Sequence, residues 1–111
     1  MISIVLPVWN AEETITNAVN SVLSQTLSDL ELIVVNDGST DSTSEIVNTI
    51  AANDNRLRQI TIAHAGVAEA FNTGLREAKW KYIARMDADD EMSITRLEKQ
   101  VQYLAEHPEI G

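Results

Sequence analysis

The chain has 111 residues, no cysteine, 44% hydrophobic residues and a formal net charge of −9 at pH 7. This length allows one domain with its own core, and no apolar run approaches the ~20 residues of a membrane-spanning helix. The acidic balance excludes a nucleic-acid backbone as partner, because neutralising phosphates needs a basic face. No Lys or Arg precedes Arg56, whereas eight acidic residues do. Any phosphate handled by the first half must therefore be held by backbone amides or by a bound metal ion.

The first residues carry no basic segment ahead of their apolar run, which argues against a signal peptide. The absence of cysteine rules out a disulfide framework and thiolate metal sites. Together these features favour a cytoplasmic protein.

The first half of the chain alternates strand and helix patterns. Residues 2–8 form a nearly continuous apolar, β-branched run, typical of a strand buried on both faces. Asn10 is a candidate N-cap, and Glu12 suits the first turn of a helix whose apolar residues follow at helical spacing (Ile15, Val19, Val22 and Leu23). Residues 32–36 predict a second strand, and the turn-rich residues 37–41 can cap a helix that carries Ile46, Val47 and Ile50.

The second half repeats this unit. Residues 57–63 alternate as a third strand, residues 67–79 predict a helix, and residues 82–86 predict a fourth strand. The helix has Ala70, Phe71, Leu75 and Ala78 on one face, and a last helix carries Ile94, Leu97, Val101 and Leu104. This alternation predicts an α/β, Rossmann-like fold, a mainly parallel sheet with helices on both faces. Ligands of such sheets bind outside the carboxyl ends of the strands, where we expect residues 7–10, 37–39 and 87–90.

An acid cluster follows the fourth predicted strand. Asp87 and Asp89 are two residues apart, so on an extended backbone they point to the same side, while Asp90 points away. Two converging carboxylates either share a proton or hold a cation, and oxygen ligands suit Mg²⁺ or Mn²⁺. The alternative is a solvated acidic loop that caps the next helix.

Common phosphate-binding motifs are absent. The chain contains neither G-x-G-x-x-G after its first strand nor G-x-x-x-x-G-K-[ST]. In place of such a motif, a divalent ion bound to the acid cluster could neutralise the charge of a diphosphate leaving group. A D-x-D phosphatase or phosphotransferase with Asp87 as nucleophile is a rival, although that motif usually follows the first strand. An EF-hand loop fails, because its sixth position holds Met92 instead of Gly.

Five ordered segments resemble the inverting glycosyltransferases of family 2, which have the GT-A fold. The segments are Pro7-Val8-Trp9-Asn10-Ala11-Glu12, Ser21 to Thr26, Val34 to Asp41, Ala70 to Gly74, and Tyr82 to Asp90 with Arg96-Leu97-Glu98. The resemblance covers essentially the whole chain. Trp9 stands where the family commonly has Tyr, Trp80 replaces a usual Gly, and Ala65 replaces a usual polar residue. The position of Trp80 is compatible with an oligomer contact.

The resemblance implies a nucleotide-diphospho-sugar donor, with a UDP-sugar as the first expectation. It implies that Pro7, Val8, Trp9, Asn10 and Glu12 line the nucleoside pocket and that Asp37 contacts the base. It also implies that Asp87 and Ala88 lie near the ribose, and that Asp89, with Asp87, binds Mn²⁺ or Mg²⁺.

Family members continue beyond the equivalent of Gly111 with an acceptor-binding half that carries the general base. We therefore expect residues 1–111 to be the donor-binding half of an enzyme that transfers sugar to a glycan or lipid-linked acceptor. For the full-length protein, a place at the inner face of a membrane is compatible with this expectation. The non-enzymatic alternative is a nucleotide-sugar-binding fragment without turnover.

Overall fold

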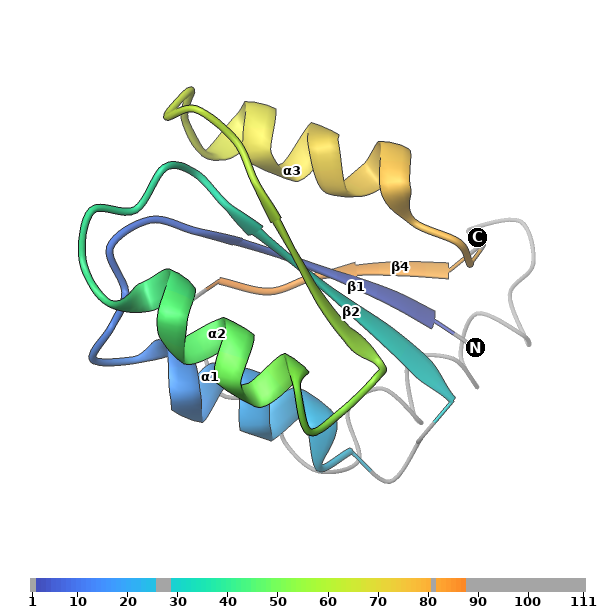
Figure 1. The fold of residues 1–111 in the computed structure, drawn as a ribbon. Helices are drawn as coiled ribbons and strands as arrows, with labels where there is room; N and C mark the ends of the chain where they lie inside the picture. Colours follow the sequence, from blue (N-terminus) through green and yellow to red (C-terminus); the bar gives the residue numbers. More distant parts are fainter. Residues whose placement is uncertain (1, 26–28, 81, 88–111) are drawn as a thin grey trace.

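The computed structural model describes residues 2–25, 29–80 and 82–87. Its elements alternate as the sequence predicts (Figure 1): β1 (Ile2–Val8), α1 (Ile15–Leu23), β2 (Leu30–Asn36), α2 (Thr43–Ala51), β3 (Leu57–Thr61), α3 (Val67–Glu77) and β4 (Tyr82–Arg85). The helix predicted after residue 90 lies outside the described residues. None of the helices in the described ranges is long and apolar enough to cross a membrane.

The four described strands form one parallel sheet in the order β3-β2-β1-β4. The chain moves outward from β1 through β2 to β3, and then crosses back to place β4 on the other side of β1. Strand order therefore reverses between β1 and β4. A reversal of this kind leaves a crevice at the carboxyl ends of the strands, where α/β proteins bind their ligands.

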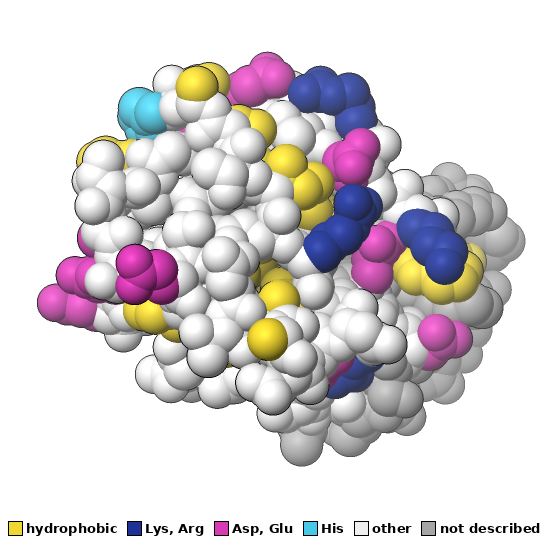
Figure 2. Space-filling model, in the orientation of Figure 1, with side chains coloured by type: hydrophobic (Ala, Val, Ile, Leu, Met, Phe, Trp, Pro, Cys, Tyr) yellow, Lys and Arg dark blue, Asp and Glu magenta, His cyan; other side chains and the backbone are white. Residues whose placement is uncertain are grey.

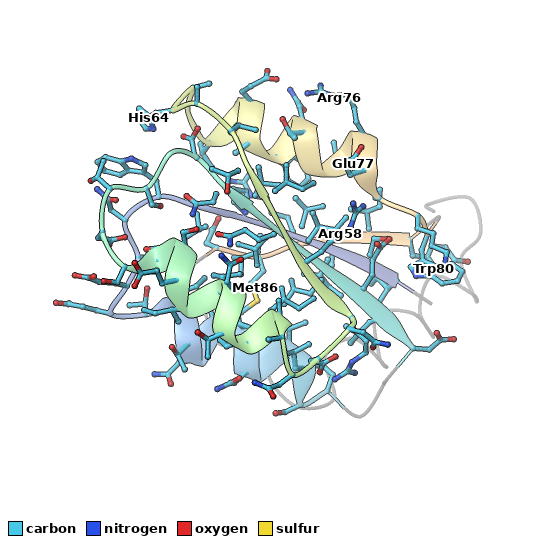
Figure 3. The ribbon with its side chains drawn as sticks, viewed as in Figure 1. Arg58, His64, Arg76, Glu77, Trp80 and Met86 are labelled. Atoms are coloured by element: carbon cyan, nitrogen blue, oxygen red, sulfur yellow. The ribbon has the colours of Figure 1, made fainter. Side chains whose placement is uncertain are left out.

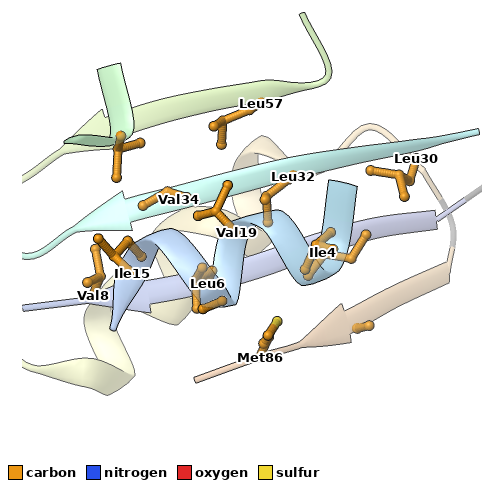
Figure 4. Packing of buried hydrophobic residues seen from close by; sticks show 14 of the residues in the cluster. Ile4, Leu6, Val8, Ile15, Val19, Leu30, Leu32, Val34, Leu57 and Met86 are labelled. Atoms are coloured by element: carbon orange, nitrogen blue, oxygen red, sulfur yellow. The ribbon is translucent and has the colours of Figure 1, made fainter. Parts of the chain in front are cut away.

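Helices cover both faces of the sheet, as predicted, and they divide the core into two layers. Alternate residues of β1 point to opposite faces. Ile4 and Leu6 pack with α1 residues such as Val19 in the larger cluster (Figure 4). Val5 packs on the other face with Ile33 and Ala70 of α3. Because both faces are covered, all seven residues of β1 are buried, which explains why six of them are apolar and why the strand does not alternate. The exception is Ser3, whose buried hydroxyl donates to the carboxylate of Glu31 at 2.7 Å.

Close packing of α3 on β1 depends on a glycine. The sequence places Leu75 on the buried face of this helix, but its side chain is 36% exposed, and the buried residues of α3 are Ala70 and Gly74. A Cβ atom at Gly74 would lie 2.3 Å from Cγ1 of Val5. The absent side chain thus lets the helix backbone approach the strand.

Several predicted element boundaries differ from the structure. β2 begins at Leu30 instead of residue 32, β3 ends at Thr61 instead of residue 63, and β4 ends at Arg85 instead of residue 86.

Two further predicted boundaries, those of α1 and α3, are wrong because of hydrogen bonds in the adjoining loops. Asn10 is not the N-cap of α1, because that helix begins at Ile15 with Thr14 as its N-cap. The α3 helix ends at Glu77 instead of residue 79. The Lys79 N–H donates to the carboxylate of Glu31 at 2.6 Å, and the Trp80 N–H donates to the hydroxyl of Ser3 at 3.0 Å. These bonds draw the chain out of the helix and into β4.

Charged side chains are unevenly distributed over the surface (Figure 2). The acidic side chains of the loops after β1 and β2 gather at the carboxyl end of the sheet, and Lys and Arg side chains gather toward the opposite end. Several of these cations are paired: Arg58 lies 3.2 Å from Glu77, and Arg76 lies 3.2 Å from Glu69. The end of the sheet where ligands are expected is therefore acidic.

Candidate functional site

A cavity of about 280 Å³ opens at the carboxyl ends of β1 and β2, beside the start of α3. It is lined mainly by apolar surface, with a few polar groups at its edge. The lining residues come from three segments: Pro7, Val8 and Trp9 after β1, Asp37 after β2, and His64, Gly66, Val67 and Ala70 around the start of α3. A concave apolar surface with few polar groups is typical of a small-molecule site.

The carboxylate of Asp37 holds the segment that precedes α3. Its Oδ1 accepts the Ala65 N–H at 2.7 Å, and its Oδ2 accepts the Gly66 N–H at 2.9 Å. The residue is only 3% exposed. Asp37 therefore joins the end of β2 to the N-terminus of α3, and the free N–H groups of that helix end favour a negative charge there.

His64 lies at the edge of the cavity and contacts both Asp37 and Trp9. Its Nδ1 is 3.0 Å from the backbone oxygen of Asp37 and 3.0 Å from Oδ2 of the same residue. Because a backbone oxygen only accepts hydrogen bonds, Nδ1 carries a proton, and in the neutral ring Nε2 is left as an acceptor. Figure 3 shows His64 at the loop end of the sheet, far from Trp80.

Trp9 and His64 together present two rings to the cavity. Their centroids are 5.0 Å apart and their planes are tilted by 33°. Trp9 is 52% exposed, which is unusual for so large an apolar side chain. Gly38 makes room for His64, since a Cβ atom at Gly38 would lie 2.9 Å from the backbone nitrogen of His64. Its φ of +71° also lies in the left-handed region that favours glycine.

The loop after β1 is bound directly to the loop after β2. The Asn10 N–H donates to the hydroxyl of Ser39 at 3.0 Å, and the Asn10 Oδ1 accepts the Thr40 N–H at 2.7 Å. These bonds hold Asn10 at a φ of +48°, in the left-handed region that Asn tolerates better than most residues. Asn10 is thus a clamp between two loops instead of a helix cap.

The carboxylates of Glu12 and Asp41 each accept a backbone N–H from the other of the same two loops. Oε2 of Glu12 accepts the Ser42 N–H at 2.9 Å, and Oδ2 of Asp41 accepts the Glu12 N–H at 3.3 Å. A hydrogen bond from the Thr43 hydroxyl, helped by the backbone N–H groups of Thr43 and Glu12, lowers the pKa of Asp41 below its ordinary value. Glu12 therefore serves the start of α2, next to the cavity and not in its wall.

Asp87 lies at the same edge of the sheet. Val5 pairs with Arg85, and the Met86 N–H donates to the oxygen of Val5 at 3.1 Å. Extending this register by two residues places Asp87 level with Pro7, which lines the cavity. Its exposed carboxylate is 3.5 Å from the guanidinium of Arg85, so these two residues form an ion pair at this edge.

The sequence comparisons identify the family. Residues 3–111 match Glycosyl transferase family 2. The chain belongs to this family. Among its relatives, the glycosyltransferase EpsJ of Bacillus subtilis strain 168, itself uncharacterised, is 43% identical over 93 residues, which is 84% of this chain and 27% of EpsJ. Chondroitin synthase of Pasteurella multocida strain Pm70 is 40% identical over 90 residues, 81% of this chain and 9% of the synthase. The chain thus spans much less than the length of these relatives.

Solved glycosyltransferases share the fold. S. aureus TarS (residues 1–349) in complex with UDP superposes with a TM-score of 0.87 at 28% identity, over 96% of this chain and 32% of that one. The mannosyltransferase PcManGT of Pyrobaculum calidifontis, in complex with GDP-Man and Mn²⁺, has a TM-score of 0.87 at 27% identity, over 94% and 32%. The predicted GT-A fold is confirmed.

Some of the residues predicted for this family 2 site meet at the cavity, and others do not. Pro7, Val8, Trp9 and Asp37 line it. Asn10 and Glu12 lie next to it and bind the neighbouring loop. Ala88 and Asp89 lie outside the described residues. Within the ranges 2–25, 29–80 and 82–87, no group of three or more His, Asp or Glu side chains could hold a metal ion.

Sequence reasoning missed the lining residues around the start of α3. Val67 is 55% exposed in a helix whose apolar residues were assigned to the core, and His64 was given no role. A signal was available, because Gly66 directly precedes a predicted helix, and such a helix start lies at the carboxyl end of the sheet with Asp37.

Proposed function

We propose that residues 2–87 bind the nucleotide of a nucleoside-diphosphate sugar, as the donor-binding half of an inverting family 2 glycosyltransferase. The observation that carries this proposal is the cavity lined by Trp9, Asp37 and Gly66 at the carboxyl ends of β1 and β2, in a chain of this family. UDP is the first nucleotide to test, because the TarS complexes contain UDP and UDP-GlcNAc.

The exposed rings favour a planar, partly apolar ligand. Stacking of a base on an aromatic side chain contributes about 1–3 kcal/mol, and the exposed ring of Trp9 offers such a surface. Nε2 of His64 can accept an N–H from the base edge. Both oxygens of Asp37 already accept backbone N–H groups, so its contact with the base stays a prediction, and its evident role is to hold His64 and Gly66.

In the bound nucleotide, the diphosphate would extend from the cavity toward Asp87. This end of the sheet is acidic, and among the described Lys and Arg residues all except Arg85 lie nearer to the other end. A divalent ion is therefore the natural group to neutralise the diphosphate. Exposed carboxylate oxygens such as those of Asp87 suit Mn²⁺ or Mg²⁺, and Asp89 would complete the pair. When bound, the ion would offset the negative charge on the departing nucleoside diphosphate.

Transfer would follow as a single displacement. The acceptor hydroxyl, from a glycan or a lipid-linked sugar, attacks the anomeric carbon, the bond to the diphosphate breaks, and a base takes the hydroxyl proton. We place that base beyond Gly111, since the relatives are several times longer than this chain. Residues 2–87 would therefore bind and orient the donor without completing the transfer.

Calorimetric titration with UDP in the presence of Mn²⁺ tests the proposal. Replacing Trp9 by Leu removes the stacking surface, so we expect UDP affinity to fall about 5- to 150-fold. Trp80→Leu is the matched control, because Trp80 lies at the opposite end of the sheet (Figure 3). Absence of UDP, GDP and ADP binding by the unaltered chain, or equal losses in the two variants, would refute the proposed site.

A further inference from the structure

A line of hydrogen-bonded side chains runs from the cavity loop into the molecule. The Asn10 N–H donates to the hydroxyl of Ser39 at 3.0 Å, and the Ser39 N–H donates to Oδ1 of Asn36 at 2.9 Å. Nδ2 of Asn36 donates to Oε1 of Gln59 at 2.9 Å. Nε2 of Gln59 donates in turn to the backbone oxygen of Ser44, at 3.2 Å, and to Oδ1 of Asn48, at 2.8 Å. We call these residues the amide relay.

The ends of the amide relay determine the orientation of both amides within it. The Ser39 N–H can only donate, so the oxygen of Asn36 must face it. The backbone oxygen of Ser44 can only accept, so the nitrogen of Gln59 must face that. Oxygen then meets nitrogen between Asn36 and Gln59, and every donor points the same way along the line. The amides of Asn36 and Gln59 each accept one bond and donate another, so the bonds on the two sides of each amide polarise and strengthen one another.

Burial makes the middle of the amide relay costly to break. Asn36 is 1% exposed, so water cannot readily replace a hydrogen-bond partner that its amide loses. No packing requirement explains a polar side chain at the end of β2, where Val34 and Val35 precede it in the core. The residue is instead tied to β3 and α2 through Gln59.

The amide relay ends on the backbone that orients Trp9. The Asn10 N–H belongs to the planar peptide group that joins Trp9 to Asn10. Its bond to Ser39 therefore restricts rotation about the preceding Cα–C bond of Trp9. With Asn10 also held at a φ of +48°, the exposed ring of Trp9 gains a fixed backbone although few side chains pack around it.

We infer that Gln59, Asn36 and Ser39 are positioning residues for nucleotide binding, which act by holding Trp9 in its orientation toward His64. This inference rests on the proposed function. Ser39 touches the loop itself, whereas Gln59 acts from β3 through Asn36.

Trp9 fluorescence tests the inference without any ligand. In a Trp80→Phe background, Trp9 is the remaining tryptophan. Ser39→Ala removes the hydroxyl that accepts the Asn10 N–H. Gln59→Met keeps a side chain of similar length but removes the amide that accepts from Asn36 and donates to Ser44 and Asn48. We expect each to lower the anisotropy of Trp9 and to raise its quenching by acrylamide. Gln59→Glu keeps the acceptor for Asn36 but sets a carboxylate oxygen against the backbone oxygen of Ser44, so we expect it to disturb Trp9 as well.

Ser42→Ala is the matched control, since it makes the same change in the same loop outside the amide relay. UDP affinity should fall about 3- to 10-fold in Ser39→Ala and stay unchanged in Ser42→Ala, with melting temperatures alike. Trp9 signals equal in the two variants would overturn the inference, as would altered signals with unchanged UDP affinity. If the parent binds no nucleotide, the proposed function fails, and the amide relay is judged on the Trp9 signals alone.

Discussion

Asn in place of Asp37 would separate the bonding role of this carboxylate from its size. In the folded chain, its two oxygens each accept one backbone N–H, from Ala65 and from Gly66. An Asn side chain has the same shape but only one oxygen. Whichever way the amide turns, its NH₂ group faces one of the two backbone N–H groups, and that group is left without an acceptor.

The expected loss follows from the burial of the site. Asp37 is 3% exposed, so water cannot readily replace the missing acceptor. An unsatisfied buried donor costs about 1–3 kcal/mol, and hydrogen bonds to a charged group contribute about 1.5–3 kcal/mol. We expect Asp37→Asn to lower the free energy of unfolding by about 2 kcal/mol. With an unfolding entropy of about 2.1 cal/mol/K per residue, that corresponds to a fall in melting temperature of about 9 °C.

Urea denaturation followed by circular dichroism measures this loss. Asp29→Asn is the control, because Asp29 is exposed and its replacement makes the same change in a net charge of −9. Unfolding curves for Asp37→Asn that differ from those for Asp29→Asn by less than about 0.5 kcal/mol would refute the assignment, since such a gap is smaller than a typical hydrogen bond. Carboxylate bonding at the start of α3 would then be unimportant for stability.

Three further predictions concern packing, pH and metal binding. Gly74→Ala should destabilise the chain by about 1–3 kcal/mol in urea, because its new Cβ would overlap Val5, and adding Val5→Ala should recover part of that loss; a neutral Gly74→Ala would contradict the packing argument. The lowered pKa of Asp41 means that its contribution to stability is complete above the ordinary Asp pKa of about 3.9 and is lost as the pH falls through the lower folded value. The difference in unfolding free energy between the parent and Asp41→Asn should thus be largest near neutral pH and shrink in acid. A difference that stays constant with pH would show that ionisation of Asp41 does not stabilise the fold. Asp89→Asn should abolish any Mn²⁺ dependence of UDP affinity in calorimetry, whereas Asp90→Asn should change it much less; equal UDP affinity with Mn²⁺ and with a chelator would remove the metal from the proposal.

Local sequence was sufficient for the layout of the sheet. The bounds of β1 are those predicted, because a short run that is nearly all apolar and rich in β-branched residues is typical of a strand covered on both faces, as β1 is here. Alternation of strands and helices was enough to predict the parallel sheet. Asp37 could be placed at the edge of a ligand site because the carboxyl ends of parallel strands share one edge.

The loops depended on tertiary structure. Asn10 and Glu12 look like the start of a helix in sequence, yet their bonding partners lie about thirty residues away, in the loop after β2. Hydropathy periodicity reports which face of an element is buried, but it carries no signal for hydrogen bonds between distant loops. His64 had no local pattern at all, and it enters the cavity because Asp37 binds the segment around it. Gly74 likewise has a role only once α3 rests on Val5, since contact between a helix and a strand is a property of the folded chain.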